Sequence, residues 1–349
     1  MLDYAEDARV QQLTAALGVA QDRPLRLQLR KLAGAMDAFL LAGTYRRMSG
    51  HHLVIATDKE EAAYLQNTLG SLLAPKEVRL LPDSFRRPLV FETLDPANVL
   101  QRTETINYLT HSKSKGEIVV TYPEALFEKV VAPEVLNEAR INIGIGENLD
   151  LDFLVEVLTE YGFKREEFIY EPGHYSIRGG IIDIFSYGND YPYRVELFDE
   201  EVESIRTFDP LNQRSVQAVD QVSIVPNINT KFRQDQKVSV FQVLPEQTVV
   251  WLKDYQLLLD KLAEAFDKAV AFGQNLSVLD DAELVQIFRD RAFIRPAEII
   301  SDVLGKPVVI YSDYRQPLAL FSDTGSTGQK ALQSPEGSPA RAIVTIDCQ

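Results

Sequence analysis

The sequence predicts an α/β protein in which two parallel-sheet segments flank a smaller α+β domain with an antiparallel sheet. Up to about residue 139, short apolar strands alternate with helices, which is the pattern of βαβ units. Short alternating strands, punctuated by glycines, then follow one another. After about residue 226 the alternation of strand and helix returns. The expected domains are therefore residues 1–139, 140–225 and 226–349.

In the first segment, alternation of apolar and polar residues predicts a strand at Leu25–Leu29, and helical spacing follows from about Ala33 to Met48. The same two signals predict the other elements of this segment. The expected strands are His52–Thr57, Val78–Leu81 and Glu117–Val120, and the expected helices are Glu60–Leu73, Pro96–Thr110 and Glu124–Val131.

The middle segment opens with a helix at Leu151–Tyr161, for which Asp150 is the expected N-cap. Between Ile141 and Val225 it holds 17 acidic and 6 basic residues, a net charge of −11. Most of the net charge of the chain, −15, therefore lies in this segment. The expected strands are His174–Arg178, Ile181–Phe185, Tyr193–Phe198, Val202–Phe208 and Val222–Val225.

The last segment is predicted to hold a strand at Thr248–Leu252 and helices at Tyr255–Phe272 and Asp281–Phe293. Ser322–Ser338 is rich in Gly, Ser, Thr and Pro, which predicts a loop. The strand-like stretch that begins at Ala342 stops almost at once, so we expect the chain to be part of a longer protein. Two more strands are expected at Val308–Ile310 and Leu318–Phe321.

Composition excludes several classes of protein. Of the 349 residues, 45% are hydrophobic and 25% charged, as in soluble globular chains. The single cysteine, Cys348, excludes a disulfide framework, and four histidines argue against a metal centre. No apolar run approaches the about 18 residues of a membrane span, and the acidic N-terminus is unlike a signal peptide. We therefore expect a cytoplasmic protein without a metal or membrane contact.

The net negative charge also argues against binding of nucleic acid by the chain as a whole. Two pairs of adjacent arginines, Arg46-Arg47 and Arg86-Arg87, are the local exceptions. We interpret both pairs as solvated surface, with contact to nucleic acid as the alternative.

A phosphate-binding loop would be expected between the strand at Leu25–Leu29 and the helix that follows. The pattern G-x-x-x-x-G-K-[ST], aligned with Gly34 inside the loop, falls on Lys31, Met36, Asp37 and Ala38. A methionine then replaces the second glycine, a carboxylate replaces the lysine, and an alanine replaces the magnesium ligand. These five residues are therefore predicted to form a degenerate phosphate loop, without bound ATP or magnesium.

Hydrolysis of a nucleotide also needs adjacent Asp and Glu residues at the end of an apolar strand, to hold magnesium and position water. The best such strand end carries one acid, Asp254, between Lys253 and Tyr255. Asp254 is better interpreted as the N-cap of the next helix. The sequence thus predicts no catalytic residue.

The middle segment shows a clearer functional signal than the phosphate-loop region, namely a strand with an exposed aromatic residue beside arginines. In the strand Tyr193–Phe198 the odd-numbered residues are apolar and are expected to face the core. The even-numbered residues, Arg194, Glu196 and Phe198, then face outward, as does Arg178 on an earlier strand. An exposed phenylalanine beside arginines is typical of a protein-binding hot spot. The alternative is that Phe198 packs under a loop while the arginines form surface ion pairs.

Two stretches, Tyr170–Phe185 (YEPGHYSIRGGIIDIF) and Pro192–Asp209 (PYRVELFDEEVESIRTFD), resemble bacterial transcription-repair coupling factors (Mfd). A weaker form of the pattern is found in the excision-repair protein UvrB. Leu81-Pro82-Asp83 and Arg102–Ile106 fit the same family more loosely. The resemblance extends over nearly the whole chain, as the N-terminal UvrB-like module of a longer protein.

The resemblance implies two helicase-like lobes with a degenerate nucleotide site and a UvrA-binding domain inserted between them. It assigns Arg178, Arg194 and Phe198 to the UvrA contact. It places ATP, magnesium and DNA translocation in the motor of the full-length protein, and contacts with RNA polymerase and DNA in other domains. In UvrB the region equivalent to Leu81–Asn98 is a long aromatic hairpin that clamps DNA, whereas here it is short and poor in aromatics.

We therefore expect a non-catalytic module that recruits UvrA to stalled transcription complexes. The alternative is a nucleotide-hydrolysing, helicase-like lobe with an atypical phosphate loop. A third possibility is that a C-terminal domain of the full-length protein masks the UvrA-binding face.

Overall fold

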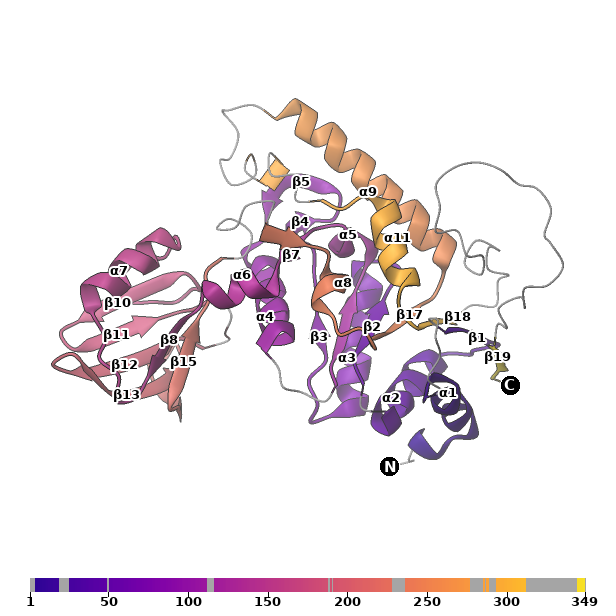
Figure 1. Ribbon diagram of the computed structural model, residues 1–349, viewed down its shortest axis with the longest axis horizontal. Coiled ribbons are helices and arrows are strands. Elements are labelled where there is room, and N and C mark those ends of the chain that lie inside the picture. Colours follow the sequence, from indigo (N-terminus) through magenta and orange to yellow (C-terminus); the bar gives the residue numbers. More distant parts are fainter. Residues whose placement is uncertain are drawn as a thin grey trace.

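The computed structural model describes residues 4–18, 25–48, 50–111, 116–187, 189, 191–227, 236–276, 285, 287–288, 293–311 and 344–348. An α/β body and a smaller α+β domain lie side by side, and the smaller domain projects from one side of the body (Figure 1). The predicted fold class, parallel α/β with an inserted antiparallel α+β domain, is confirmed.

The body is built on one parallel sheet of seven strands. Strands from before and after the inserted domain pair with one another in it, so the segments on either side of the insertion share a single sheet. The domain boundaries named above stay predictions. In spatial order the strands are β19 (Val344–Asp347), β1 (Arg26–Arg30), β18 (Val308–Tyr311), β17 (Val249–Leu252), β2 (His52–Ile55), β6 (Ile118–Thr121) and β3 (Arg79–Leu80).

Helices cover both faces of this sheet, and every residue of β2, β6, β17 and β18 is buried. Such continuous apolar strands are typical of a parallel sheet with two covered faces. Leu53 packs in the core on one face and its neighbour Val54 in the core on the other. Figure 1 shows the two layers of helices. One face is covered by α8 (Val240–Val243), α9 (Tyr255–Asn275) and α11 (Pro296–Leu304), and the other by α1 (Ala8–Gly18), α2 (Met36–Met48) and α3 (Lys59–Leu73).

The helix expected near Glu124–Val131 is present but shorter than predicted. The helix α5 (Pro123–Leu126) ends early, and β7 (Val130–Val131) pairs with β16 (Lys237–Val238) instead. Two adjacent β-branched valines favour a strand once a partner strand is present. Most of the expected helix at Asp281–Phe293 lies outside the described residues. The same holds for all of the expected strand Leu318–Phe321 and the expected loop Ser322–Ser338. Elements that were not expected include η1 (Tyr4–Glu6), α6 (Pro133–Glu138), the hairpin of β4 (Phe85–Arg87) and β5 (Val90–Leu94), and the helices α1, α8 and α11.

The smaller domain contains a six-stranded sheet, in which all neighbours are antiparallel except β9 and β10. The helix α7 (Leu151–Glu160) packs on one face, and Asp150 caps it by accepting from the Phe153 amide at 3.0 Å, as predicted. The chain enters and leaves through the paired strands β8 (Ile141–Gly144) and β15 (Gln221–Ile224). The sheet order is β14 (Ser215–Ala218), β13 (Glu201–Phe208), β12 (Tyr193–Phe198), β11 (Ile181–Ile184), β10 (His174–Arg178) and β9 (Lys164–Arg165).

Among the buried side-chain contacts that join the two halves of the body is a hydrogen bond between Trp251 and His52. The Trp251 indole donates to His52 Nδ1 at 2.9 Å, between the adjacent strands β17 and β2. Both side chains are buried, and burial lowers the pKa of His52 to about 3. Protonation of His52 therefore has to break this contact or bury a charge.

We predict that His52 makes the body less stable in mild acid. An unfolded histidine has a pKa of about 6.5, so the contribution of neutral His52 is complete above that pH and is lost as the pH falls towards about 3. Urea unfolding at several pH values should show His52 contributing a slope of up to about 1.4 kcal/mol per pH unit between pH 6 and pH 4. His52→Asn keeps an acceptor for Trp251 but cannot titrate, so its slope should be smaller. Equal slopes for the two proteins would contradict this account.

Candidate functional site

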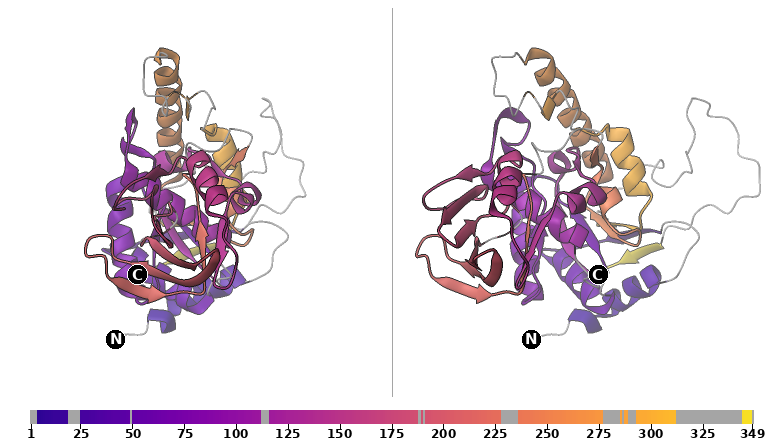
Figure 2. Two further views of the ribbon diagram at one scale, coloured as in Figure 1. Left: turned by 90° about the vertical axis from the view of Figure 1, so that its left-hand side faces the viewer. Right: turned by 60° about the vertical axis from the view of Figure 1, so that its left-hand side comes forward.

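The candidate site is the face of the six-stranded sheet opposite α7, which we call the outer face. The smaller domain is turned toward the viewer in the left panel of Figure 2. Strand register aligns three charged residues across it: Asp183 on β11 lies opposite Arg194 on β12, and Arg194 lies opposite Arg206 on β13. Arg178 on β10 and Glu196 on β12 lie on the same face, two positions further along. We call these five residues the ion-pair cluster.

Asp183 is the centre of the cluster, with a side chain that is 3% exposed. It accepts from Arg178 Nη2 at 2.6 Å, from Arg194 Nε at 2.7 Å and from Arg194 Nη2 at 2.8 Å. Arg194 also donates to Gln213 at 3.1 Å, and its guanidinium lies 4.3 Å from the centre of the Phe208 ring. A buried carboxylate is tolerated because two cations pair with it. In return, Asp183 holds Arg194 in one orientation.

The second ion pair of the cluster lies nearer to solvent. Arg206 donates to both oxygens of Glu196, at 3.0 and 2.5 Å, and Ser204 Oγ donates to Glu196 at 2.6 Å. The side chains of Arg206 and Glu196 are 30% and 28% exposed. Hydrogen bonds from Arg206 and Ser204 lower the pKa of Glu196, so it is ionised at neutral pH.

Apolar side chains stand exposed around these charges. Phe198, at the end of β12, is 73% exposed, so the alternative that it packs under a loop is wrong. Phe168 is also exposed, and the Arg178 guanidinium lies 5.3 Å from its ring centre. Leu211 is exposed in the loop that supplies Gln213. The outer face thus combines arginines with uncovered apolar surface, which is the composition of protein-binding hot spots.

A close backbone contact positions the end of β12. The amide of Leu197 donates to the carbonyl of Gly180 at 2.7 Å, in the turn between β10 and β11. A Cβ atom at Gly180 would lie 2.8 Å from the Leu197 carbonyl oxygen, and Gly179 has a φ of +61°. Glycine is therefore required at Gly180 for the close approach. This contact holds the segment that carries Phe198.

The structure places the three residues assigned to the UvrA contact, Arg178, Arg194 and Phe198, on this one face. It also confirms one half of the alternative interpretation, because both arginines form ion pairs within the domain; their shared partner, Asp183, was not identified from the sequence. A single carboxylate inside the apolar run Ile181–Phe185 was the available signal. Arg206 was missed because its partner, Glu196, lies on another strand.

The segment predicted to be a degenerate phosphate loop lies between β1 and α2, and its assignment stays a prediction. Lys31 and Gly34 have left-handed backbone, and Met36, Asp37 and Ala38 begin α2. The Asp37 carboxylate accepts from the Ala38 amide at 2.7 Å, and burial raises its pKa. A side-chain carboxylate thus occupies the start of the helix, where a phosphate would need free amides.

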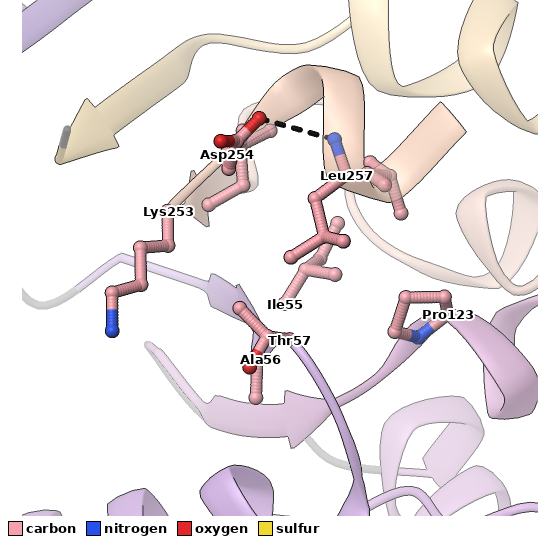
Figure 3. A pocket seen from close by; sticks show the side chains of 9 residues that line it. Ile55, Ala56, Thr57, Pro123, Lys253, Asp254 and Leu257 are labelled. Carbon is pink, nitrogen blue, oxygen red and sulfur yellow. Dashed lines mark hydrogen bonds between the residues drawn. The ribbon is translucent and has the colours of Figure 1, made fainter. Parts of the chain in front are cut away.

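A small pocket opens at the carboxyl ends of β2 and β17 (Figure 3). The pocket has a volume of about 10 Å³, which is enough for roughly one water molecule. A site for a small molecule has a volume of about 300 Å³ or more. Asp254 lines the pocket and accepts from the Leu257 amide at 3.1 Å, which confirms the predicted N-cap of α9. Lys253 lines it too and pairs with Glu61 at 3.0 Å.

In the part of the chain that the structure describes, no three His, Cys, Asp or Glu side chains come together in a way that could hold a metal ion. Among the helices described, none is long and apolar enough to cross a bilayer.

Comparison with known proteins identifies the smaller domain. Residues 141–229 match the family described as the UvrB interaction domain. The chain is 32% identical over 237 residues to a transcription-repair-coupling factor of Bacillus subtilis (strain 168), covering 68% of this chain and 20% of that protein. It is 31% identical to relatives of the same name from Myxococcus xanthus, over 58% of this chain and 17% of the relative, and Staphylococcus haemolyticus, over 64% and 18%.

The chain thus matches about a fifth of the length of these curated relatives. We conclude that residues 141–229 are a UvrB interaction domain and that the chain belongs to the family of transcription-repair-coupling factors, in which it corresponds to the UvrB-like N-terminal module.

Proposed function

We propose that this chain is a recruitment module whose outer face binds the excision-repair protein UvrA. The observation that supports this best is the convergence of Arg178, Arg194 and Phe198 on one face of a UvrB interaction domain. Phe198 is 73% exposed there, beside the arginines, so its ring is accessible to a partner.

The charge distribution supports an acidic contact surface on the partner. The segment Ile141–Val225 has a net charge of −11, yet three of its six basic residues lie in the ion-pair cluster. This background repels nucleic acid and leaves the arginines for a protein. Arg178 uses one N–H in its bond to Asp183, and its side chain is 38% exposed, so its other donors can bind a carboxylate of the partner.

Preorganisation also favours a binding role. Asp183 and Gln213 hold Arg194, and the ring of Phe208 lies under it. An arginine that is already ordered loses less side-chain entropy when a partner binds. In the proposed complex, Phe198 contributes apolar contact area, and the ordered Arg194 fixes how an acidic group of the partner is oriented.

The wider role follows from the family. We propose that the module brings UvrA to stalled transcription complexes in the cytoplasm, while other parts of the longer protein bind RNA polymerase and translocate on DNA with ATP and magnesium. Masking of the outer face by a C-terminal domain of that protein stays a further possibility. We propose no catalysis by this chain, because Asp37 and Ala38 replace the groups that would hold a nucleotide.

Phe198→Ala should weaken UvrA binding at least about thirtyfold, because a hot-spot side chain typically contributes about 2 kcal/mol or more. Its melting temperature should stay unchanged, since the ring is 73% exposed. The matched control is Phe153→Ala on α7, which is 63% exposed and lies away from the outer face. Titration calorimetry with UvrA measures both variants, and wild-type affinity in Phe198→Ala would refute the assignment.

Arg194 variants should affect stability as well as binding. Arg194→Ala leaves the buried Asp183 with Arg178 alone, so it should destabilise the domain, by less than the about 3–5 kcal/mol of a fully unpaired buried charge. Asp183→Asn in the same chain should restore part of that loss, because no buried charge remains. Thermal unfolding of the two single variants and the double variant measures the coupling. Additive effects would show that the pair has no energetic role.

ATP with magnesium should not bind to this chain at concentrations up to about 1 mM, because the Asp37 carboxylate occupies the start of α2 and repels phosphate. Titration calorimetry is the measurement. Micromolar binding would favour the alternative of a nucleotide-hydrolysing, helicase-like lobe.

A further inference from the structure

The geometry of β12 constrains any partner that binds the outer face. Arg194, Glu196 and Phe198 alternate along one strand and lie on the same side of it. Neighbours on one face are about 7 Å apart, so Glu196 lies midway between the two proposed contact residues. A partner that touches both Arg194 and Phe198 must therefore cover Glu196.

Covering a carboxylate is unfavourable unless it is paired and hydrogen-bonded. An unpaired Glu196 would also repel the acidic groups that Arg178 and Arg194 are proposed to attract. In this structure the carboxylate is already satisfied: Arg206 binds both of its oxygens, and Ser204 donates a third hydrogen bond. The lowered pKa of Glu196 agrees with this pairing.

We propose that Arg206 is a specificity-determining residue of the UvrA interface, where it acts by neutralising Glu196 rather than by touching UvrA. This inference rests on the proposed function and extends it. Arg206 neutralises the carboxylate of Glu196, and the three arginines and two acids of the ion-pair cluster sum to a charge of +1, so an acidic partner surface can lie across it. If Arg206 does not pair with Glu196, covering this carboxylate lowers the affinity for the partner.

The test is a double-variant cycle on this chain, with UvrA affinity measured by titration calorimetry. Arg206→Gln should weaken binding about tenfold or more, because it exposes the carboxylate of Glu196 to the partner. Glu196→Gln alone should bind as well as the wild type or better. Combining the two substitutions should restore binding to within about threefold of the wild type.

Salt dependence provides a second readout that a purely structural role would not change. The deficit of Arg206→Gln should shrink in high salt, since it arises from repulsion between charges. A double variant as weak as Arg206→Gln would overturn the proposal, because Arg206 would then contact UvrA directly. Wild-type binding by Arg206→Gln would overturn it too.

Measuring Phe198→Ala in the same experiment distinguishes failure of the proposed UvrA-binding function from failure of the proposed role of Arg206. If Phe198→Ala is weak and Arg206→Gln binds normally, this inference alone fails. If Phe198→Ala binds normally, UvrA does not use the outer face, and both the proposed function and this inference fail.

Discussion

The outer face of the smaller domain depends on one buried carboxylate. Asp183 lies on the middle of three strands and receives hydrogen bonds from Arg178 on one side and Arg194 on the other. Without it, two cations would repel each other and lose their orientation; without them, a charge that is 3% exposed would be unpaired. Because the three side chains order one another, the face can present arginines in a fixed position. The exposed ring of Phe198 adds apolar area beside a surface that is already organised.

The attachment of the domain explains how such an insertion leaves the body intact. The chain leaves the body along β7 and returns along β16, and these two strands pair with each other. It then enters and leaves the domain along β8 and β15, which also pair. Each end of the insertion therefore lies beside the other, so the parallel sheet of the body stays continuous. The strands β17 and β18, far along the chain, complete that sheet between β1 and β2.

The sequence predicted what depends on local periodicity. Strand alternation correctly predicted that Phe198 faces outward, since successive side chains of a regular strand point to opposite faces. It could not show that Asp183 meets Arg194, because this depends on the register between β11 and β12, and a shift by one residue would turn Asp183 into the core. The order of the strands in the parallel sheet could not be predicted either, because it also depends on which strands pair. The edge strand β14 was missed because all of its residues are exposed and no apolar alternation marks it. The acidic N-caps Asp150 and Asp254, by contrast, are local signals and were found, whereas Asp58, which caps α3, was not predicted.

Hydrogen–deuterium exchange of this chain, with and without UvrA, tests the central claim most directly, because it maps the contact without altering any residue. The account predicts slower exchange in β12 and in the turn at Gly179-Gly180 when UvrA is bound, while α7, on the opposite face of the domain, keeps its rate. Protection confined to α7 or to the body, with no change on the outer face, would contradict it.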